Sequence, residues 1–149
     1  MKRKRTREAV LPGRTKRCFG RLPKKYWFAL NQDSIADFNQ CPKCYGSTRP
    51  RKFALLIHVE GSGIIVLGKT CRYCVSCEVI IAHQKGLESE LANVFLARKP
   101  EVIGNPYLVI GTVDIRTWRK GLQSANTLEQ ILDKASDFKH QLTMHSVPS

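Results

Sequence analysis

The chain has 149 residues and a formal net charge of +13, from 25 Lys and Arg against 12 Asp and Glu. This length suffices for one domain with a hydrophobic core. Apolar runs such as 64–67 and 79–82 fall far short of the roughly 20 residues that cross a bilayer as a helix. Further basic residues, not an apolar segment, follow the basic start, so we expect no signal peptide. We therefore expect a cytoplasmic protein whose cysteines stay reduced and bind metal.

The positive charge is concentrated in the first third of the chain. Residues 1–52 carry 15 Lys and Arg against 3 acidic residues, a net +12, whereas residues 53–149 carry 10 against 9, a net +1. Each cation that neutralises a phosphate releases a condensed counterion, so this asymmetry predicts a polyanionic partner. We predict nucleic acid, either RNA or DNA, and no membrane.

Residues 1–25 are predicted to be a disordered basic arm. They contain 11 basic residues, two Pro and two Gly, and too few apolar residues to bury a core. Attachment to nucleic acid is the functional interpretation, and a solvated tail or a targeting address is the alternative. The residues predicted to contact phosphates are Arg3, Lys4, Arg5, Arg14, Lys16, Arg17, Lys24 and Lys25, together with Arg49, Arg51 and Lys52 beyond the arm.

Five closely spaced cysteines carry the clearest chemical signal. The first motif is Cys41-Pro-Lys-Cys44, and 26 residues later the second reads Cys71-Arg-Tyr-Cys74-Val-Ser-Cys77. A C-x-x-C turn directs two thiolates toward one point, and two such turns make a tetrahedral Zn²⁺ site with bonds of roughly 2.3 Å. The gap exceeds the usual spacing of about 15 to 20 residues, which a longer hairpin accommodates.

The sequence leaves open which cysteine is the fourth ligand. Pairing Cys71 with Cys74 requires the turn Arg72-Tyr73, whereas pairing Cys74 with Cys77 lets the β-branched run 78–82 leave as a strand. We favour the second arrangement because such a run suits a strand. The remaining thiol would then pack as a small apolar side chain. Cys18, in the basic arm, is expected to be a free thiol.

Residues 40–82 resemble a zinc ribbon, in which two metal-binding knuckles are joined by antiparallel strands. The segments Trp27-Phe28-Ala29-Leu30-Asn31 and Ile103-Gly104-Asn105 extend a resemblance to small uncharacterised bacterial zinc-ribbon proteins. The resemblance implies contact with nucleic acid or protein and no particular reaction. Four thiolates fill a zinc site and leave no position for an activated water, so we expect no catalysis. Catalysis would require a site of three cysteines and a water, or one that uses His83.

Periodicity predicts the elements around the cysteines. Strand patterns cover 26–30, 53–59, 64–67, 78–82 and 107–113, and a helical pattern covers 84–98. Thr127 and Gln130 form a capping box at the start of a second helix. Its apolar stripe continues to the C-terminal region through Leu128, Ile131, Leu132, Ala135, Phe138 and Leu142. Residues 115–121 are predicted to be a short helix or surface segment, in which Trp118 packs on the core or its basic neighbours face phosphates.

Together these elements predict an α+β fold, a zinc ribbon with a small antiparallel sheet packed by two helices. The predicted domain spans 26–143, and 144–149 is a frayed tail. Residues 63–70 match the phosphate-loop pattern G-x-x-x-x-G-K-[ST], but four β-branched or bulky residues within it favour an extended strand, so we predict no nucleotide site.

The predicted function is non-catalytic nucleic-acid binding with structural zinc. The alternative is a protein–protein adaptor or a subunit of a larger complex, docked through the ribbon and the C-terminal helix.

Overall fold

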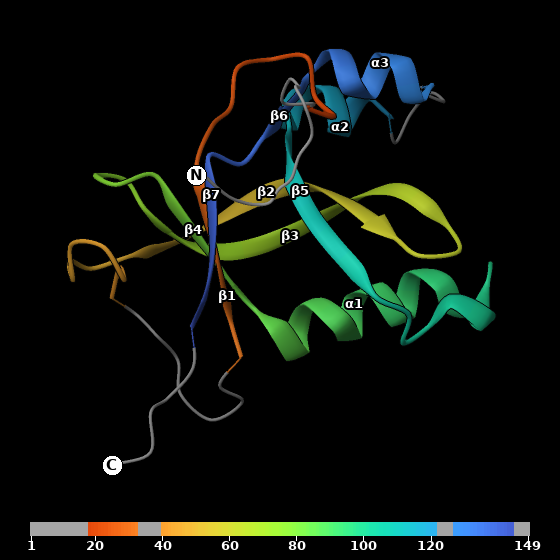
Figure 1. Cartoon of the computed structure of the whole chain (residues 1–149), viewed down its shortest axis with the longest axis horizontal. Helices are drawn as coiled ribbons and strands as arrows, with labels where there is room; N and C mark the ends of the chain where they lie inside the picture. The colour runs from red at the N-terminus through yellow and green to blue at the C-terminus, as the bar shows by residue number, and fades with distance from the viewer. Residues whose placement is uncertain (1–17, 33–39, 122–126, 145–149) are drawn as a thin grey trace, which may run out of the picture.

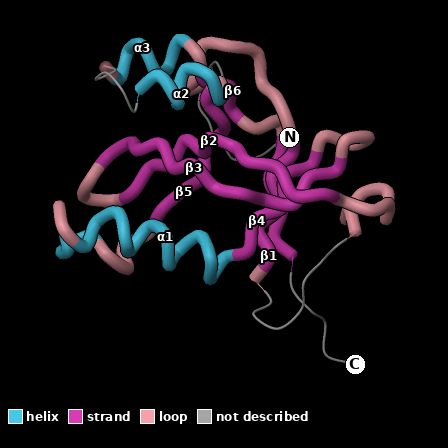
Figure 2. The backbone as a smooth tube through the Cα atoms, turned by 180° about the vertical axis from the view of Figure 1, so that it is seen from behind, coloured by secondary structure: helices cyan, strands magenta, loops and turns pink. Residues whose placement is uncertain are grey.

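The computed structural model describes residues 18–32, 40–121 and 127–144. Its strands form one mixed sheet in the order β6-β5-β2-β3-β4-β1-β7, with α1 on one side and α2 and α3 on the other (Figures 1 and 2). The strands are β1 (Trp27–Asn31), β2 (Arg49–Val59), β3 (Gly63–Cys74), β4 (Val79–His83), β5 (Tyr107–Val113), β6 (Ala135–Asp137) and β7 (His140–Met144). The helices are α1 (Gln84–Leu96), α2 (Ile115–Gly121) and α3 (Leu128–Asp133), with a 3-10 turn at Pro100–Val102.

The antiparallel hairpin of β2 and β3 is the centre of the sheet. It pairs continuously from Arg49 with Tyr73 to Val59 with Gly63. Both faces of β2 are buried, because alternate residues pack toward α1 and toward α2 and α3. A strand covered on both sides is expected to be almost continuously apolar, as 53–57 is. The α1 side carries the larger core, to which the helix contributes Leu87, Leu91 and Phe95.

The sheet curves into a half-barrel, and a short connection joins its two edges at one end. β6 pairs with β5 at one edge, and β7 pairs in parallel with β1 at the other. Only Phe138 and Lys139 separate β6 from β7. Their backbone N–H groups donate to the carbonyls of Ile110 on β5 and of Tyr26 before β1, both at 2.9 Å. The chain therefore crosses from one edge to the other and holds the two edges together at this end.

This architecture corrects the predicted fold class. The molecule is not a ribbon with a small antiparallel sheet packed by two helices, because the sheet has seven strands and includes parallel pairs around β1. The helix predicted over 127–142 starts with the predicted capping box of Thr127 and Gln130, but it ends at Asp133. The next residues instead complete both edges of the sheet as β6 and β7. Phe138 faces the interior and stacks on Phe28, with 4.8 Å between ring centroids and 12° between planes.

Other predicted elements are present. The strands expected within 26–82 and over 107–113, and the helix from residue 84, all form. The phosphate-loop match lies within the extended strand β3, where the ammonium of Lys69 pairs with Glu90 at 2.6 Å. Trp118 on α2 packs against β3 so closely that a Cβ on Gly68 would lie 2.4 Å from the indole ring. In the described ranges, no helix is long and apolar enough to cross a membrane.

The end of the predicted arm lies along β6. The backbone N–H groups of Leu22 and Lys25 donate to the carbonyls of Ala135 and Asp137 at 3.0 and 2.9 Å. Arg21 pairs with Glu129 and Asp133 of α3, and these carboxylates raise the pKa of its guanidinium. Residues 1–17 of the predicted arm and 145–149 of the predicted tail lie outside the described residues.

The stacking of Phe138 on Phe28 predicts the effect of truncation at the crossing between the edges. Phe138→Ala should lower the free energy of unfolding by about 3 to 5 kcal/mol, because it removes a buried ring from a packed core. Leu128→Ala, at a side chain 49% exposed on α3, should change it by no more than about 0.5 kcal/mol. Urea unfolding of the two variants measures both. A larger effect at Leu128 than at Phe138 would contradict the observed packing.

Candidate metal centre

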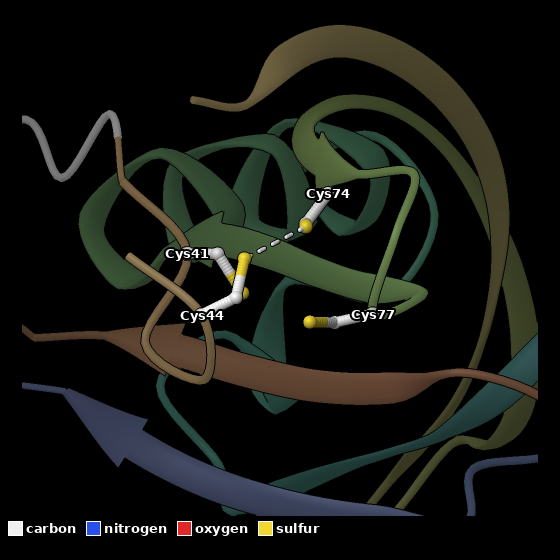
Figure 3. Close-up of side chains that lie close together, drawn as sticks. All are labelled: Cys41, Cys44, Cys74 and Cys77. Atoms are coloured by element: carbon white, nitrogen blue, oxygen red, sulfur yellow. Dashed lines mark hydrogen bonds between the residues drawn. The ribbon is translucent and has the colours of Figure 1, made fainter. Parts of the chain in front are cut away.

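Four cysteines from two distant turns gather at one point. Cys41 and Cys44 lie in the loop before β2, Cys74 ends β3, and Cys77 lies in the turn before β4 (Figure 3). Their sulfur atoms all lie within 4.8 Å of one another, and those of Cys44 and Cys74 are 3.7 Å apart. Four bonds of 2.3 Å to a tetrahedral ion would place the sulfurs about 3.8 Å apart. The cluster can therefore hold a metal ion after only small adjustments.

The two turns have the same backbone geometry. In each, the residue after the second cysteine donates its N–H to the carbonyl of the first, from Tyr45 to Cys41 and from Glu78 to Cys74, both at 2.8 Å. These two residues have positive φ angles of 63° and 57°. A non-glycine residue in this left-handed region carries a cost of about 1 to 2 kcal/mol. Both turns thus accept backbone strain to point their sulfurs at a common centre.

Backbone N–H groups also approach the sulfurs directly. Lys43 donates to the Sγ of Cys41 and Gly46 to the Sγ of Cys44, each at 3.3 Å. The Gly46 hydrogen bond is the main reason that the pKa of Cys44 is lowered. The hydrogen bond to Cys44, followed by burial, raises the pKa of Cys77 to about 12. Without a metal the cluster therefore holds its protons unevenly, and a bound cation must displace them, so that metal affinity falls as the pH falls.

Cys71 is separate from this cluster. It is buried in the core on the α1 side, where its thiol lies 3.7 Å from the carbonyl oxygen of Lys69. Burial raises its pKa to about 12, which keeps it a neutral thiol. The arrangement that pairs Cys74 with Cys77 is therefore the one the structure brings together. Cys18 is exposed, and His83, at the N-cap of α1, is not among the clustered residues.

The cluster fixes the start of β2 to the turn between β3 and β4. Its buried cysteines pack with Ala29 of β1 and with Val79 and Ile81 of β4. Lys43, within the first turn, places its ammonium 3.7 Å from the centre of the Trp27 ring. A metal here would lock the loop from which β2 emerges, and with it the position of the basic residues on that strand.

Five cations surround a cleft near this strand, which we call the basic cleft. The cleft has a volume of about 380 Å³. Its cations are Lys25, Arg51, Lys52, Arg119 and Lys134, and Asp114 is the one carboxylate among the described residues that line it. Of the predicted phosphate contacts, Lys25, Arg51 and Lys52 line the cleft and Lys24 and Arg49 are exposed elsewhere. The other six, Arg3, Lys4, Arg5, Arg14, Lys16 and Arg17, lie outside the described residues.

The basic cleft follows an unpaired strand edge. β5 pairs with β2 only from Ala54 onward, so the part of β2 before it has no strand on this edge among the described residues. Aromatic rings hold the cations in place. Arg51 lies 4.9 Å from the ring centre of Phe53, Lys52 lies 5.2 Å from that of Trp118, and Lys25 lies 4.9 Å from that of Tyr26. Arg119 is one of the basic neighbours of Trp118 that were predicted, as one of two alternatives, to face phosphates. Lys134 was not predicted, because only the pairing of β6 with β5 brings it to the cleft.

A second, larger cavity of about 600 Å³ lies between α1, β5 and β7. Its walls are mainly apolar, and no Lys or Arg occurs among the described residues that line it. Glu88 accepts hydrogen bonds on Oε2 from the Tyr107 hydroxyl and the Gln84 amide, both at 2.9 Å. Burial is the main reason that the pKa of Tyr107 is raised. This cavity differs from the basic cleft in both charge and lining.

Comparison with known proteins returns no match to a family model, to a curated protein or to a solved structure. The arrangement of the four cysteines is compatible with a zinc-ribbon-like metal site.

Only substitutions at the four clustered cysteines should change the metal content of the protein. Cys74→Ser should lose the metal and lower the melting temperature sharply, because it removes a central ligand. Cys71→Ala and Cys18→Ser should both keep one metal ion per chain. Elemental analysis of purified variants, with thermal unfolding, measures this. Loss of metal in Cys71→Ala with retention in Cys77→Ser would contradict a metal site at the four clustered cysteines.

Proposed function

We propose that the protein is a non-catalytic nucleic-acid-binding protein in which Zn²⁺ at Cys41, Cys44, Cys74 and Cys77 is structural. The observation that carries the proposal is the basic cleft, where five cations meet one carboxylate beside an unpaired strand edge. Cations held over aromatic rings are already ordered, so less side-chain entropy is lost when they bind phosphates. The open edge of β2 adds backbone N–H groups that suit the same ligand.

Zinc is the metal that this ligand set favours. Four thiolates in tetrahedral geometry are typical of Zn²⁺ in structural sites. With all four positions occupied by sulfur, no water can bind the metal, and no other group in the cluster acts as a base. The zinc would therefore stabilise the loop before β2 and leave binding to the cleft. Residues 1–17 add eight further basic residues to the same chain.

Salt dependence tests the proposal directly. Affinity for a fluorescein-labelled 20-base-pair duplex should fall as salt rises, and each lost phosphate contact should reduce the slope of log affinity against log salt by about 0.9. The double variant Arg119→Ala/Lys134→Ala removes two exposed cations of the cleft, so the slope should decrease by about 1.8. Lys85→Ala, at an exposed cation of α1, is the matched control. Equal slopes for the double variant and the wild type would overturn the role of the cleft.

The apolar cavity supports a second candidate function, binding of a partner protein. β6 pairs with β5 only at Gly111–Val113, so Tyr107–Ile110 pairs with β2 on one side and has no described strand on the other, apart from single contacts by Phe138 and Gln141. β7 is the opposite edge of the sheet and lines the same cavity. An extended peptide of a partner protein could pair with β5 and place apolar side chains in the cavity. The predicted C-terminal helix ends at Asp133, so the apolar cavity replaces it as the proposed docking surface.

Selection of binding peptides tests this second function separately from nucleic-acid binding. Phage-displayed peptides selected on the purified protein should converge on alternating apolar residues and should compete with one another. Ala92→Trp, which fills the cavity, should reduce their affinity at least tenfold, whereas Arg119→Ala should not. Peptides that bind the Ala92→Trp variant as tightly as the wild type, or a selection without convergence, would contradict it.

A further inference from the structure

The tip of the first cysteine turn carries an unusually placed aromatic side chain. Tyr45 is 74% exposed and has a φ of 63°. A glycine would adopt this conformation without strain. Because the Tyr45 side chain is exposed, it adds nothing to the hydrophobic core. The positive φ belongs to the turn, because Glu78 shares it, so it does not explain why this exposed position carries an aromatic side chain. The equivalent position in the second turn holds a charged residue, Glu78, so the turn itself does not require an aromatic residue.

Further groups suited to nucleic acid lie beside the same turn. The ammonium of Lys43 is 3.7 Å from the ring centre of Trp27, and that ring lies 4.6 Å from the ring of His140 on β7. Lys43 and His140 are exposed and Trp27 is partly exposed. We call Tyr45, Lys43, Trp27 and His140 the knuckle strip; Tyr45 belongs to it through the cysteine turn that it shares with Lys43. It combines aromatic faces with a cation, which is the composition that binds unpaired bases and their backbone.

We propose that Tyr45 stacks on an unpaired base and that the protein therefore prefers single-stranded nucleic acid to duplex. This inference rests on the proposed nucleic-acid-binding function and adds its substrate class. In a duplex the base faces are covered by their neighbours, so an exposed tyrosine can stack only where a strand is single. The basic cleft contacts phosphates, which both forms offer, and the knuckle strip distinguishes between them.

The test compares two fluorescein-labelled probes, a 15-nucleotide oligo(dT) and a 15-base-pair duplex, by anisotropy at fixed salt. Tyr45→Ala should weaken binding to the single strand by about 5- to 150-fold, the range for loss of one stacked base. Binding to the duplex should stay within twofold. Tyr45→Phe keeps the ring and should bind the single strand like the wild type.

Tyr45→Gly separates a structural role from a binding role. Because glycine relieves the backbone strain, this variant should keep its zinc and melt at or above the wild-type temperature, yet lose single-strand affinity as Tyr45→Ala does. Unchanged affinity in Tyr45→Ala, or equal losses on both probes, overturns the stacking role and leaves the basic cleft intact as a binding site. Absence of binding to both probes by the wild type overturns the proposed function itself, and the stacking role with it.

Discussion

Convergence of two short turns on one point is the constraint on which the rest of the structure depends. The turns are separated by the β2–β3 hairpin, so joining them fixes the open end of the longest paired segment in the sheet, where Arg49 pairs with Tyr73. Apparent zinc binding energies of about 10 to 16 kcal/mol are comparable to the whole folding free energy of a typical domain, about 5 to 15 kcal/mol. A metal here would therefore decide whether β2 has a defined start, and so where Arg49, Arg51 and Lys52 lie.

The short strand β1 connects the cysteine cluster with the crossing between the two sheet edges. It lies between β4 and β7, and its Ala29 packs against the cysteine cluster. Just before β1, the carbonyl of Tyr26 accepts a hydrogen bond from Lys139, where the chain crosses between the two sheet edges. Loss of the cysteine cluster, or of the crossing at Lys139, would free one side of β1. The cysteine cluster and the half-barrel are therefore expected to be coupled in stability, even though they share few side chains.

The features predicted correctly from the sequence are those that depend on residues close together in the chain. Cysteine spacing predicted a cluster of four among five cysteines and favoured Cys77 over Cys71 as its fourth member. Alternation identified β2 and β3, and the capping box of Thr127 and Gln130 marked the start of α3. The errors arose where distant segments decide the outcome. Residues 135–144 repeat apolar side chains at intervals that fit a helix, and only the unpaired edges of β5 and β1, remote in sequence, make strands the better solution. The strain at Tyr45 was also hidden, because positive φ without glycine has no sequence signal.

Electrostatics explain why the two proposed binding surfaces should differ in chemistry. One Zn²⁺ with four thiolates carries a formal net charge of about −2, and the charge of the ion must be counted in any argument about the site. Phosphates close to such a centre would be repelled unless cations intervene, and Lys43 is drawn over the Trp27 ring. An uncharged base face is not repelled in this way. Under the proposed function, the knuckle strip would therefore contact bases, and the basic cleft, lined by five cations, would contact phosphates.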